Sequence, residues 1–249
     1  MNNNNDLLPA KAEPSKAFFI EMLTRDISLS DCILDLADNS IHCLIASSGL
    51  DVSEHLFSGT KARKTSANIV IDFDGKSFRV KDTCGGISIE EATNQVFLLG
   101  NPVTERNRAG LGVYGIGMKR AFFKIGKQVS IVSHTTDEEF KIDIDVDKWK
   151  NTAKWEFPFT YARPKKSATG GTQIEVTGLH DSVSDQFASK AFSTILGERA
   201  SRVYALFLKA GVQITVAGVQ AKPDIPELAE SKDLRCFPLW LRFSDWSRV

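Results

Sequence analysis

Asp35 and Asn39 stand one helical turn apart and carry the chemistry that the sequence displays most directly. Side chains four positions apart lie on the same face of a helix, so a carboxylate and an amide would meet there. The carboxylate can orient and deprotonate a water while the amide oxygen holds a cation beside it. Taken alone, the same pair also fits a solvated helix face.

A glycine-rich segment points to a second kind of chemistry, the binding of phosphate. Four glycines precede a stretch that predicts a helix, and they are Gly110, Gly112, Gly115 and Gly117. Where a glycine loop opens a helix, unpaired backbone N–H groups and the positive end of the helix dipole collect phosphate. A purely structural glycine loop is the alternative interpretation.

Two well-known phosphate motifs do not fit this segment. The dinucleotide-binding pattern requires a strand directly before Gly110, whereas residues 101–108 are polar and contain a proline. A Walker-type loop would place a lysine and a hydroxyl directly after the last glycine. Here Lys119 is displaced by one position and the hydroxyl is missing.

Two shorter segments complete the pattern. Together with the Asp35–Asn39 pair and the glycine-rich segment, we call them the four islands. Asp82 closes a predicted strand and is soon followed by Gly85 and Gly86, which would force a turn, and Gly171 with Thr172 opens another predicted strand. Taken in order along the chain, the four islands suggest a nucleotide site.

The elements that must position these residues follow from the apolar periodicity. Helices are predicted from residue 17, after Ser30 as N-cap, and at about 88–98, 115–124 and 183–209. Strands are predicted at 68–73 and 76–81 around an Asp74-Gly75 turn, and at 128–134, 139–146, 153–158, 172–177 and 212–217. Because strands and helices do not alternate regularly, the pattern favours an α+β layer sandwich over a doubly wound parallel sheet.

The composition is that of an ordinary globular chain. The 249 residues are 42% hydrophobic and 25% charged, and 31 basic residues balance 31 acidic ones. The zero net charge offers no long-range attraction for nucleic acid or anionic lipid, and no apolar run approaches the roughly 20 residues that span a bilayer. The four cysteines show no Cys-x-x-Cys spacing, which favours free thiols in the cytoplasm.

The four islands together resemble the GHKL ATPases, the family of gyrase B, the heat-shock chaperone of that class, MutL, MORC proteins and histidine-kinase catalytic domains. The resemblance implies the Bergerat ATP-binding fold, a two-layer α/β sandwich with helices on one face of a mixed, mostly antiparallel sheet. It divides the chain into a flexible arm (1–15), the ATP-binding domain (16–225) and a C-terminal extension or the start of a missing or partner-completed module (226–249).

The resemblance also assigns roles to the islands. Asn39 would coordinate Mg²⁺, and Asp35, which takes the place of the family's glutamate, would deprotonate the attacking water. Asp82 would accept the adenine amino group with Gly86 beside it, although Cys84 replaces the middle glycine of that box. The further ATP-binding positions would be Gly110, Gly112, Gly115, Gly117, Lys119 as in MORC-like members, and Thr172.

The function implied is that of a module that binds Mg-ATP and hydrolyses it slowly, acting as a molecular clamp that changes shape or dimer state within a larger assembly. Its expected partners are ATP, a second copy of the chain, and a protein partner or missing C-terminal domain. Nucleic acid would be contacted only indirectly, and a membrane not at all. Two alternatives stay open: a histidine-kinase-type catalytic domain, and a nucleotide sensor that binds without turnover.

Overall fold

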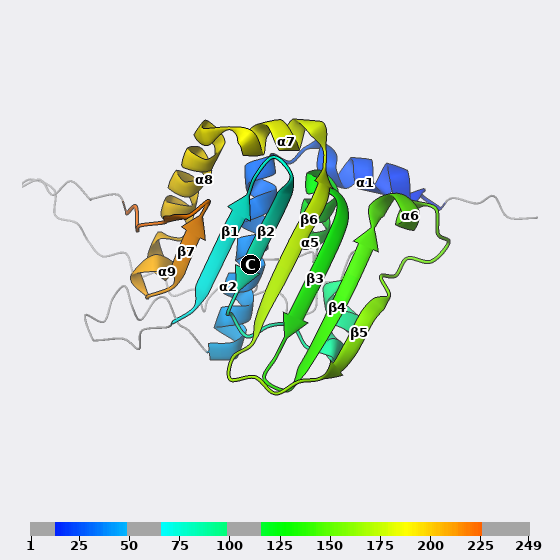
Figure 1. Ribbon diagram of the computed structural model, residues 1–249, viewed down its shortest axis with the longest axis horizontal. Helices are drawn as coiled ribbons and strands as arrows, with labels where there is room; N and C mark the ends of the chain where they lie inside the picture. Colours follow the sequence, from blue (N-terminus) through cyan, green and yellow to red (C-terminus); the bar gives the residue numbers. More distant parts are fainter. Residues whose placement is uncertain (1–12, 49–65, 99–115, 226–249) are drawn as a thin grey trace, which may run out of the picture.

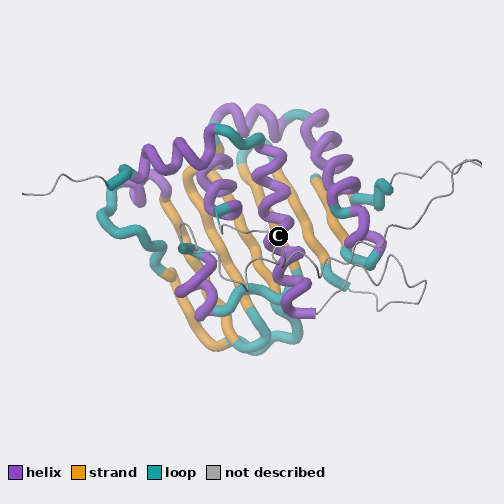
Figure 2. Tube along the Cα trace, turned by 180° about the vertical axis from the view of Figure 1, so that it is seen from behind, coloured by secondary structure: helices purple, strands orange, loops and turns teal. Residues whose placement is uncertain are grey.

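The computed structural model describes residues 13–48, 66–98 and 116–225, which form two layers. One layer is an eight-stranded sheet, and the helices pack against one of its two faces (Figure 1). The view from behind has the helices in front of the strands (Figure 2). This is the predicted α+β sandwich. No helix within the described ranges is long and apolar enough to span a bilayer.

The sheet has the order β5-β4-β3-β6-β2-β1-β7-β8. All neighbouring strands run antiparallel except β1 and β7, which pair in parallel with Ile69 opposite Ile214. The strands are β1 Asn68–Phe73, β2 Ser77–Asp82, β3 Gly126–His134, β4 Glu138–Asp145, β5 Phe159–Pro164, β6 Gly171–Leu179, β7 Gln213–Val216 and β8 Val219–Gln220.

The helical layer contains the two helices that matter most for the site, α2 (Leu29–Ser48) and α5 (Gly117–Ile125). The others are α1 Lys16–Arg25, α4 Ile89–Glu91, a π-helical turn η1 Ala92–Val96, α6 Val146–Lys150, α7 Asp181–Ala188, α8 Lys190–Val203 and α9 Ala205–Lys209.

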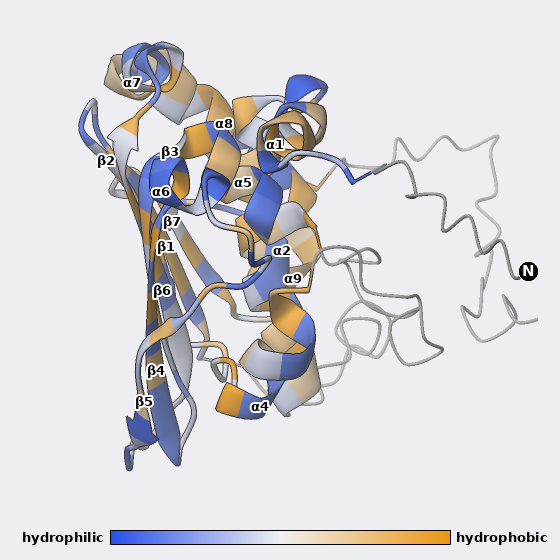
Figure 3. Ribbon diagram, turned by 90° about the vertical axis from the view of Figure 1, so that its right-hand side faces the viewer, coloured by the Kyte–Doolittle hydropathy of each residue, from blue (hydrophilic) through white to orange (hydrophobic). Residues whose placement is uncertain are grey.

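The core lies between the sheet and the helices (Figure 3). Alternate residues of the central strands are buried, among them Phe78 and Ile131, and the apolar stripes of α2 and α5 cover them with Ile33 and Phe122, all at 0% exposure. Because the side chains of a strand alternate between faces, the same strands leave charged residues on the uncovered face. The apolar residues that recur every second position in the strands and about every 3.6 positions in the helices therefore pack together in one core.

The predicted strand at 153–158 is wrong, since these residues form no regular element and β5 begins at Phe159. Side chains satisfy this backbone instead of a neighbouring strand. The Lys16 ammonium donates to the Lys154 carbonyl oxygen at 2.6 Å and the Trp149 indole N–H donates to the Glu156 carbonyl oxygen at 3.2 Å. The segment therefore packs over α1 and α6.

The predicted helix at 183–209 is divided into α7, α8 and α9. It breaks at Ser189, whose backbone is extended (φ −83°, ψ 121°), and again at Tyr204, whose hydroxyl donates to the Leu34 carbonyl oxygen at 2.9 Å. The first break lets α7 and α8 run in different directions (Figure 1), and at the second break Tyr204 anchors the chain to α2.

Smaller boundaries also differ from the prediction. Helix α2 begins at Leu29, and the hydroxyl of Ser28, not of Ser30, accepts the Asp31 N–H at 3.1 Å. Three residues, not two, separate β1 from β2, because Asp74 Oδ1 accepts the N–H groups of Lys76 and Ser77 at 2.8 Å each. Helix α6 and strand β8 were not predicted.

Candidate functional site

Helix α2 presents one polar edge beside its buried apolar stripe. Asp35 and Asn39 are half-buried on this edge, and Ser40 is buried. The Asn39 Nδ2 group donates to the Asp35 carbonyl oxygen at 2.8 Å. Because this bond occupies the nitrogen, it turns the side-chain oxygen of Asn39 away from the helix backbone, where it can serve as an acceptor or a cation ligand.

Asp82, the last residue of β2, is held by three hydrogen bonds, from helix α2, from strand β6 and from the turn that follows β2. Its Oδ1 atom accepts the N–H of Cys84 at 2.9 Å and the N–H of Thr172 at 3.2 Å. Its Oδ2 atom accepts the Ser40 hydroxyl at 2.8 Å. The carboxylate therefore ties the end of β2 to helix α2 and to the start of β6.

These contacts leave one acceptor position for recognition. A carboxylate oxygen has two lone pairs, so the hydrogen bonds fill Oδ1 completely and Oδ2 by half. Burial raises the pKa of Asp82 above its usual value, against the opposing effect of the bonds from Cys84, Ser40 and Thr172. The site thus offers one acceptor lone pair, fixed in direction, to a donor such as an exocyclic amine.

The turn after Asp82 is built on close backbone approaches. Gly86 has a φ of +75°, and a Cβ atom there would lie 2.0 Å from the His134 carbonyl oxygen, so only glycine fits. Ala217 is the one non-glycine residue with a positive φ in the described ranges, so the backbone of Cys84 accepts a side chain at the position where glycine was expected. The Cys84 side chain is buried at 1% exposure.

Thr172 is connected to the same turn from the side of β6. Its hydroxyl lies 2.8 Å from the Ser133 hydroxyl, and Ser133 Oγ also accepts the Ile87 N–H at 2.8 Å. Ser133 is fully buried and Thr172 is 9% exposed. This chain of hydroxyls fixes the loop that follows Gly86 onto the sheet.

The start of α5 meets the middle of α2 at Gly117. A Cβ atom at Gly117 would lie 3.3 Å from Asp35 Oδ2, which places the helix start directly against the carboxylate. The same oxygen accepts a hydrogen bond from Arg120 Nη2 at 2.5 Å. Asp35 is therefore an ion-paired side chain in this structure.

Lys119 is fully buried, although a lysine in the first turn of a helix is usually exposed. Its ammonium donates to the Leu98 carbonyl oxygen at 2.6 Å, and burial lowers the pKa of Lys119 to about 8. The side chain joins α5 to the end of the 89–98 segment.

The structure thus brings most of the sequence-predicted residues into one connected arrangement. Direct contacts link Asp35 with Asn39 and Gly117, and Asp82 with Thr172, while α2 connects the two groups through Ser40. Lys119 points toward Leu98 at the margin of this arrangement. Gly86 lies in the turn after Asp82, and the other three predicted positions lie outside the described residues: Gly110, Gly112 and Gly115.

Two partners of the predicted site residues, Ser40 and Arg120, were not predicted from the sequence, nor was Tyr204, which binds the same helix α2. Ser40 could have been anticipated, because a buried carboxylate needs donors and Ser40 follows Asn39 directly. Arg120 gives no sequence signal, being one more basic residue on an amphipathic helix. Tyr204 is far away in sequence, yet its hydroxyl oxygen also lies 2.7 Å from Asp38 Oδ1 on α2.

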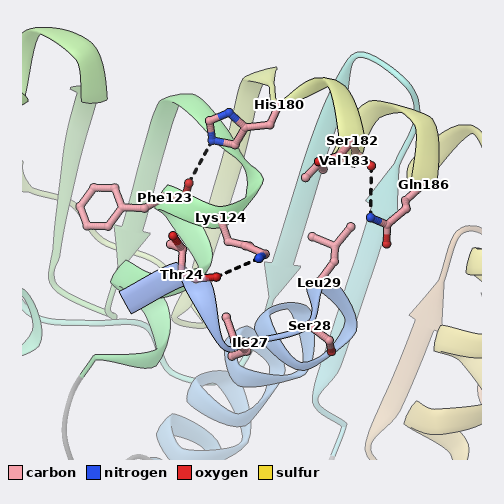
Figure 4. A pocket seen from close by; sticks show the side chains of 10 residues that line it. All are labelled: Thr24, Ile27, Ser28, Leu29, Phe123, Lys124, His180, Ser182, Val183 and Gln186. Carbon is pink, nitrogen blue, oxygen red and sulfur yellow. Dashed lines mark hydrogen bonds between the residues drawn. The ribbon is translucent and has the colours of Figure 1, made fainter. Parts of the chain in front are cut away.

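A separate hollow of about 430 Å³ lies between the end of α1, the start of α2 and the start of α7 (Figure 4). The Lys124 ammonium crosses it to donate to the Thr24 carbonyl oxygen at 2.8 Å, and His180 Nε2 lies 3.0 Å from the Phe123 carbonyl oxygen. No predicted site residue lines this hollow.

A comparison with known protein families identifies the class of protein to which the chain belongs. Residues 27–174 match the model of the family described as histidine kinase-, DNA gyrase B- and HSP90-like ATPases. The match covers more than half of the chain and extends from the start of α2 into β6, so the chain belongs to this family. No curated protein matched the chain. Family membership makes the chain an ATP-binding module of the GHKL ATPase type.

Proposed function

We propose that this module binds Mg-ATP between α2, the Asp82 turn and the start of α5, and that it hydrolyses ATP slowly. The observation that carries the proposal is the Asp82 carboxylate, whose two oxygens hold three donors and keep one lone pair for an adenine amino group. A guanine carbonyl in the same place would face an unpaired acceptor, so the site favours adenine.

The proposed phosphate end is formed by Asn39 and Asp35, which precede Ser40 on α2. The side-chain oxygen of Asn39 fits magnesium, which prefers oxygen ligands and keeps water and phosphate oxygens in its shell. When bound, the cation would neutralise phosphate charge. Asp35 faces the start of α5 and is the group we propose to orient the attacking water and take its proton.

Slow turnover follows from the length of the proposed base. Aspartate is one methylene shorter than the glutamate that the GHKL family carries at this position. A displacement of the base by about 1 Å can lower a rate about 100-fold. The pairing of Asp35 with Arg120 also favours a second candidate function, a sensor that binds ATP without hydrolysing it.

The wider proposal extends beyond the site. We propose that the module corresponds to residues 16–225, that it is closest in style to MORC-like and MutL-like proteins, and that ATP drives a dimerisation or shape change in a larger cytoplasmic assembly. The described cysteines Cys32, Cys43 and Cys84 are free thiols, which is compatible with that compartment.

Phosphate release separates the ATPase from the sensor. Asp35→Ala should abolish Mg-dependent phosphate release from ATP while leaving ATP binding measurable, because it removes the proposed base and its ion pair with Arg120 but none of the proposed ATP ligands. Asp72→Ala, an exposed aspartate on β1, is the matched control and should behave as wild type. If wild type releases no more phosphate than Asp35→Ala, hydrolysis is refuted and the sensor remains.

Calorimetry tests the magnesium ligand. Asn39→Ala should lower the affinity for ATP by about tenfold or more when Mg²⁺ is present, and little when it is absent. Asn151→Ala is the control, because Asn151 makes the same bond to a backbone carbonyl four residues earlier at 2.9 Å but lies at the end of α6. An unchanged affinity of Asn39→Ala with Mg²⁺ would contradict the assignment.

A further inference from the structure

The ion pair between Asp35 and Arg120 stands where the proposed base must work. Arg120 Nη2 lies 2.5 Å from Asp35 Oδ2, and the two side chains are 29% exposed for Arg120 and 26% for Asp35. The pair joins α2 to α5 just behind Gly117, which faces the same oxygen. An oxygen that accepts an arginine proton has one lone pair fewer for a proton from water.

Arg120 is also an incompletely satisfied arginine. Its Nε atom is buried and has no hydrogen-bond partner, the only such buried side-chain atom among the described residues. A guanidinium has five N–H donors in a planar fork, and an unpaired buried donor costs free energy. The arrangement with Asp35 alone therefore leaves Arg120 with unused capacity for a multidentate acceptor.

The chemistry of that acceptor follows from the guanidinium and from its position. Arginine pairs bidentately with carboxylates and phosphates, and a phosphate offers more oxygens and more charge than one carboxylate. Arg120 is in the first turn of α5, the helix that begins at Gly117. The other acid of α2 near it, Asp31, is already held by Arg199 at 2.5 Å.

We propose that Arg120 exchanges Asp35 for the terminal phosphate of ATP, so that the carboxylate is released when a triphosphate binds. The inference rests on the proposed function, because it takes the phosphate end of the site to lie at Asp35 and Gly117. ADP lacks the terminal phosphate and leaves the ion pair intact. Arg120 is then a phosphate-binding residue that makes the site distinguish ATP from ADP.

A double-mutant cycle with two nucleotides tests the exchange. Calorimetry on the full chain would measure dissociation constants of ATP and ADP for wild type, Arg120→Gln, Asp35→Asn and the double variant. Arg120→Gln should weaken ATP binding about tenfold and ADP binding less than about twofold. Asp35→Asn, which removes the competing carboxylate, should strengthen ATP binding more when Arg120 is present than in the double variant.

Two controls exclude an unspecific effect. Arg79→Gln removes the same charge from the Arg79–Glu175 pair on the uncovered sheet face and should leave the ratio of ATP to ADP affinity unchanged. Arg120→Lys keeps the charge but not the fork, so it should weaken ATP binding by an intermediate factor. It also provides the readout if Arg120→Gln fails to fold.

The outcomes separate the inference from the proposed function. If wild type binds ATP but Arg120→Gln and Arg120→Lys weaken ATP and ADP equally or not at all, the exchange is wrong and the ATP site stands. Additive effects of Arg120→Gln and Asp35→Asn on ATP binding would also refute the exchange. If wild type binds neither nucleotide, the proposed function fails and the exchange fails with it.

Discussion

At the scale of single residues, Asp82 has the most constrained surroundings in the proposed site. Two backbone N–H groups fix one of its oxygens and Ser40 fixes the other, so the direction of the remaining lone pair is set by α2, β6 and the turn after β2. Base recognition by such a group depends on whether the group accepts or donates the hydrogen bond, and not only on the shape of the site.

Asp82→Asn should replace the acceptor that faces the base with a donor while preserving the turn. The amide oxygen can keep the bonds from Cys84 and Thr172, and the Ser40 hydroxyl can accept from the new NH₂ group. ATP affinity should fall about 10- to 100-fold, while the affinity for inosine triphosphate, which has a carbonyl in place of the amine, should rise relative to ATP. Titration calorimetry with both nucleotides measures the ratio. An unchanged ratio would show that Asp82 does not face the base.

At the scale of elements, the edge strand β5 depends on one acid of its neighbour β4. Glu139 is 5% exposed and accepts hydrogen bonds from Lys165, from Arg163 at 2.9 Å and from Tyr161 at 3.2 Å. These groups, Lys165 above all, lower the pKa of Glu139 to about 2, although its burial acts in the opposite direction. The strand is otherwise mostly exposed.

Glu139→Gln should destabilise the fold in a pH-dependent way. Because the pKa of Glu139 is lower in the folded protein than its ordinary value of 4.5, ionisation stabilises the folded state above that value, and the stabilisation is lost as the pH falls through about 2. Urea unfolding should give a loss of about 1–2 kcal/mol at pH 7 that shrinks below pH 4.5. Glu156→Gln, at an exposed acid, should change stability little. A loss that is constant with pH would refute the ion-pair explanation.

At the scale of the whole molecule, the helical layer leaves an apolar surface on α1. Phe18 and Met22 lie on one side of this helix and are 54% and 55% exposed. Exposed apolar side chains in a cluster favour contact with another surface. The expected dimer requires such a surface, and α1 also packs against α5, the helix that begins at the proposed phosphate end.

Light scattering should detect this dimer. With Mg²⁺ and a non-hydrolysable ATP analogue the mass should shift from one chain toward two, since a ligand that binds the dimer better shifts the equilibrium to it. Met22→Glu should prevent the shift without affecting nucleotide binding, whereas Asn39→Ala should weaken both the binding of the analogue and the shift. An unchanged mass of wild type with bound analogue would contradict the ATP-dependent dimer.

The sequence predicted the layers and most elements because their signals are local. The alternation in β3 and the apolar stripe of α2 are periodicities that a short window contains. The 153–158 segment has similar β-forming residues, but Lys16 and Trp149 bind its backbone, and they come from other elements. Likewise, Tyr204 interrupts the predicted 183–209 helix through a bond to α2.

The sequence by itself determined the residue types of the proposed site and the order of the elements that carry them. Asp35 and Asn39 had to share a helix face because their spacing is one turn, and Asp82 had to end a strand because glycines follow it. Only the tertiary structure decided which side chains donate hydrogen bonds to the two carboxylates: Ser40 donates to Asp82, and Arg120 donates to Asp35. The physical reason is that a hydrogen bond depends on position in space, and residues 42 and 85 positions apart become neighbours only when the helices pack on the sheet.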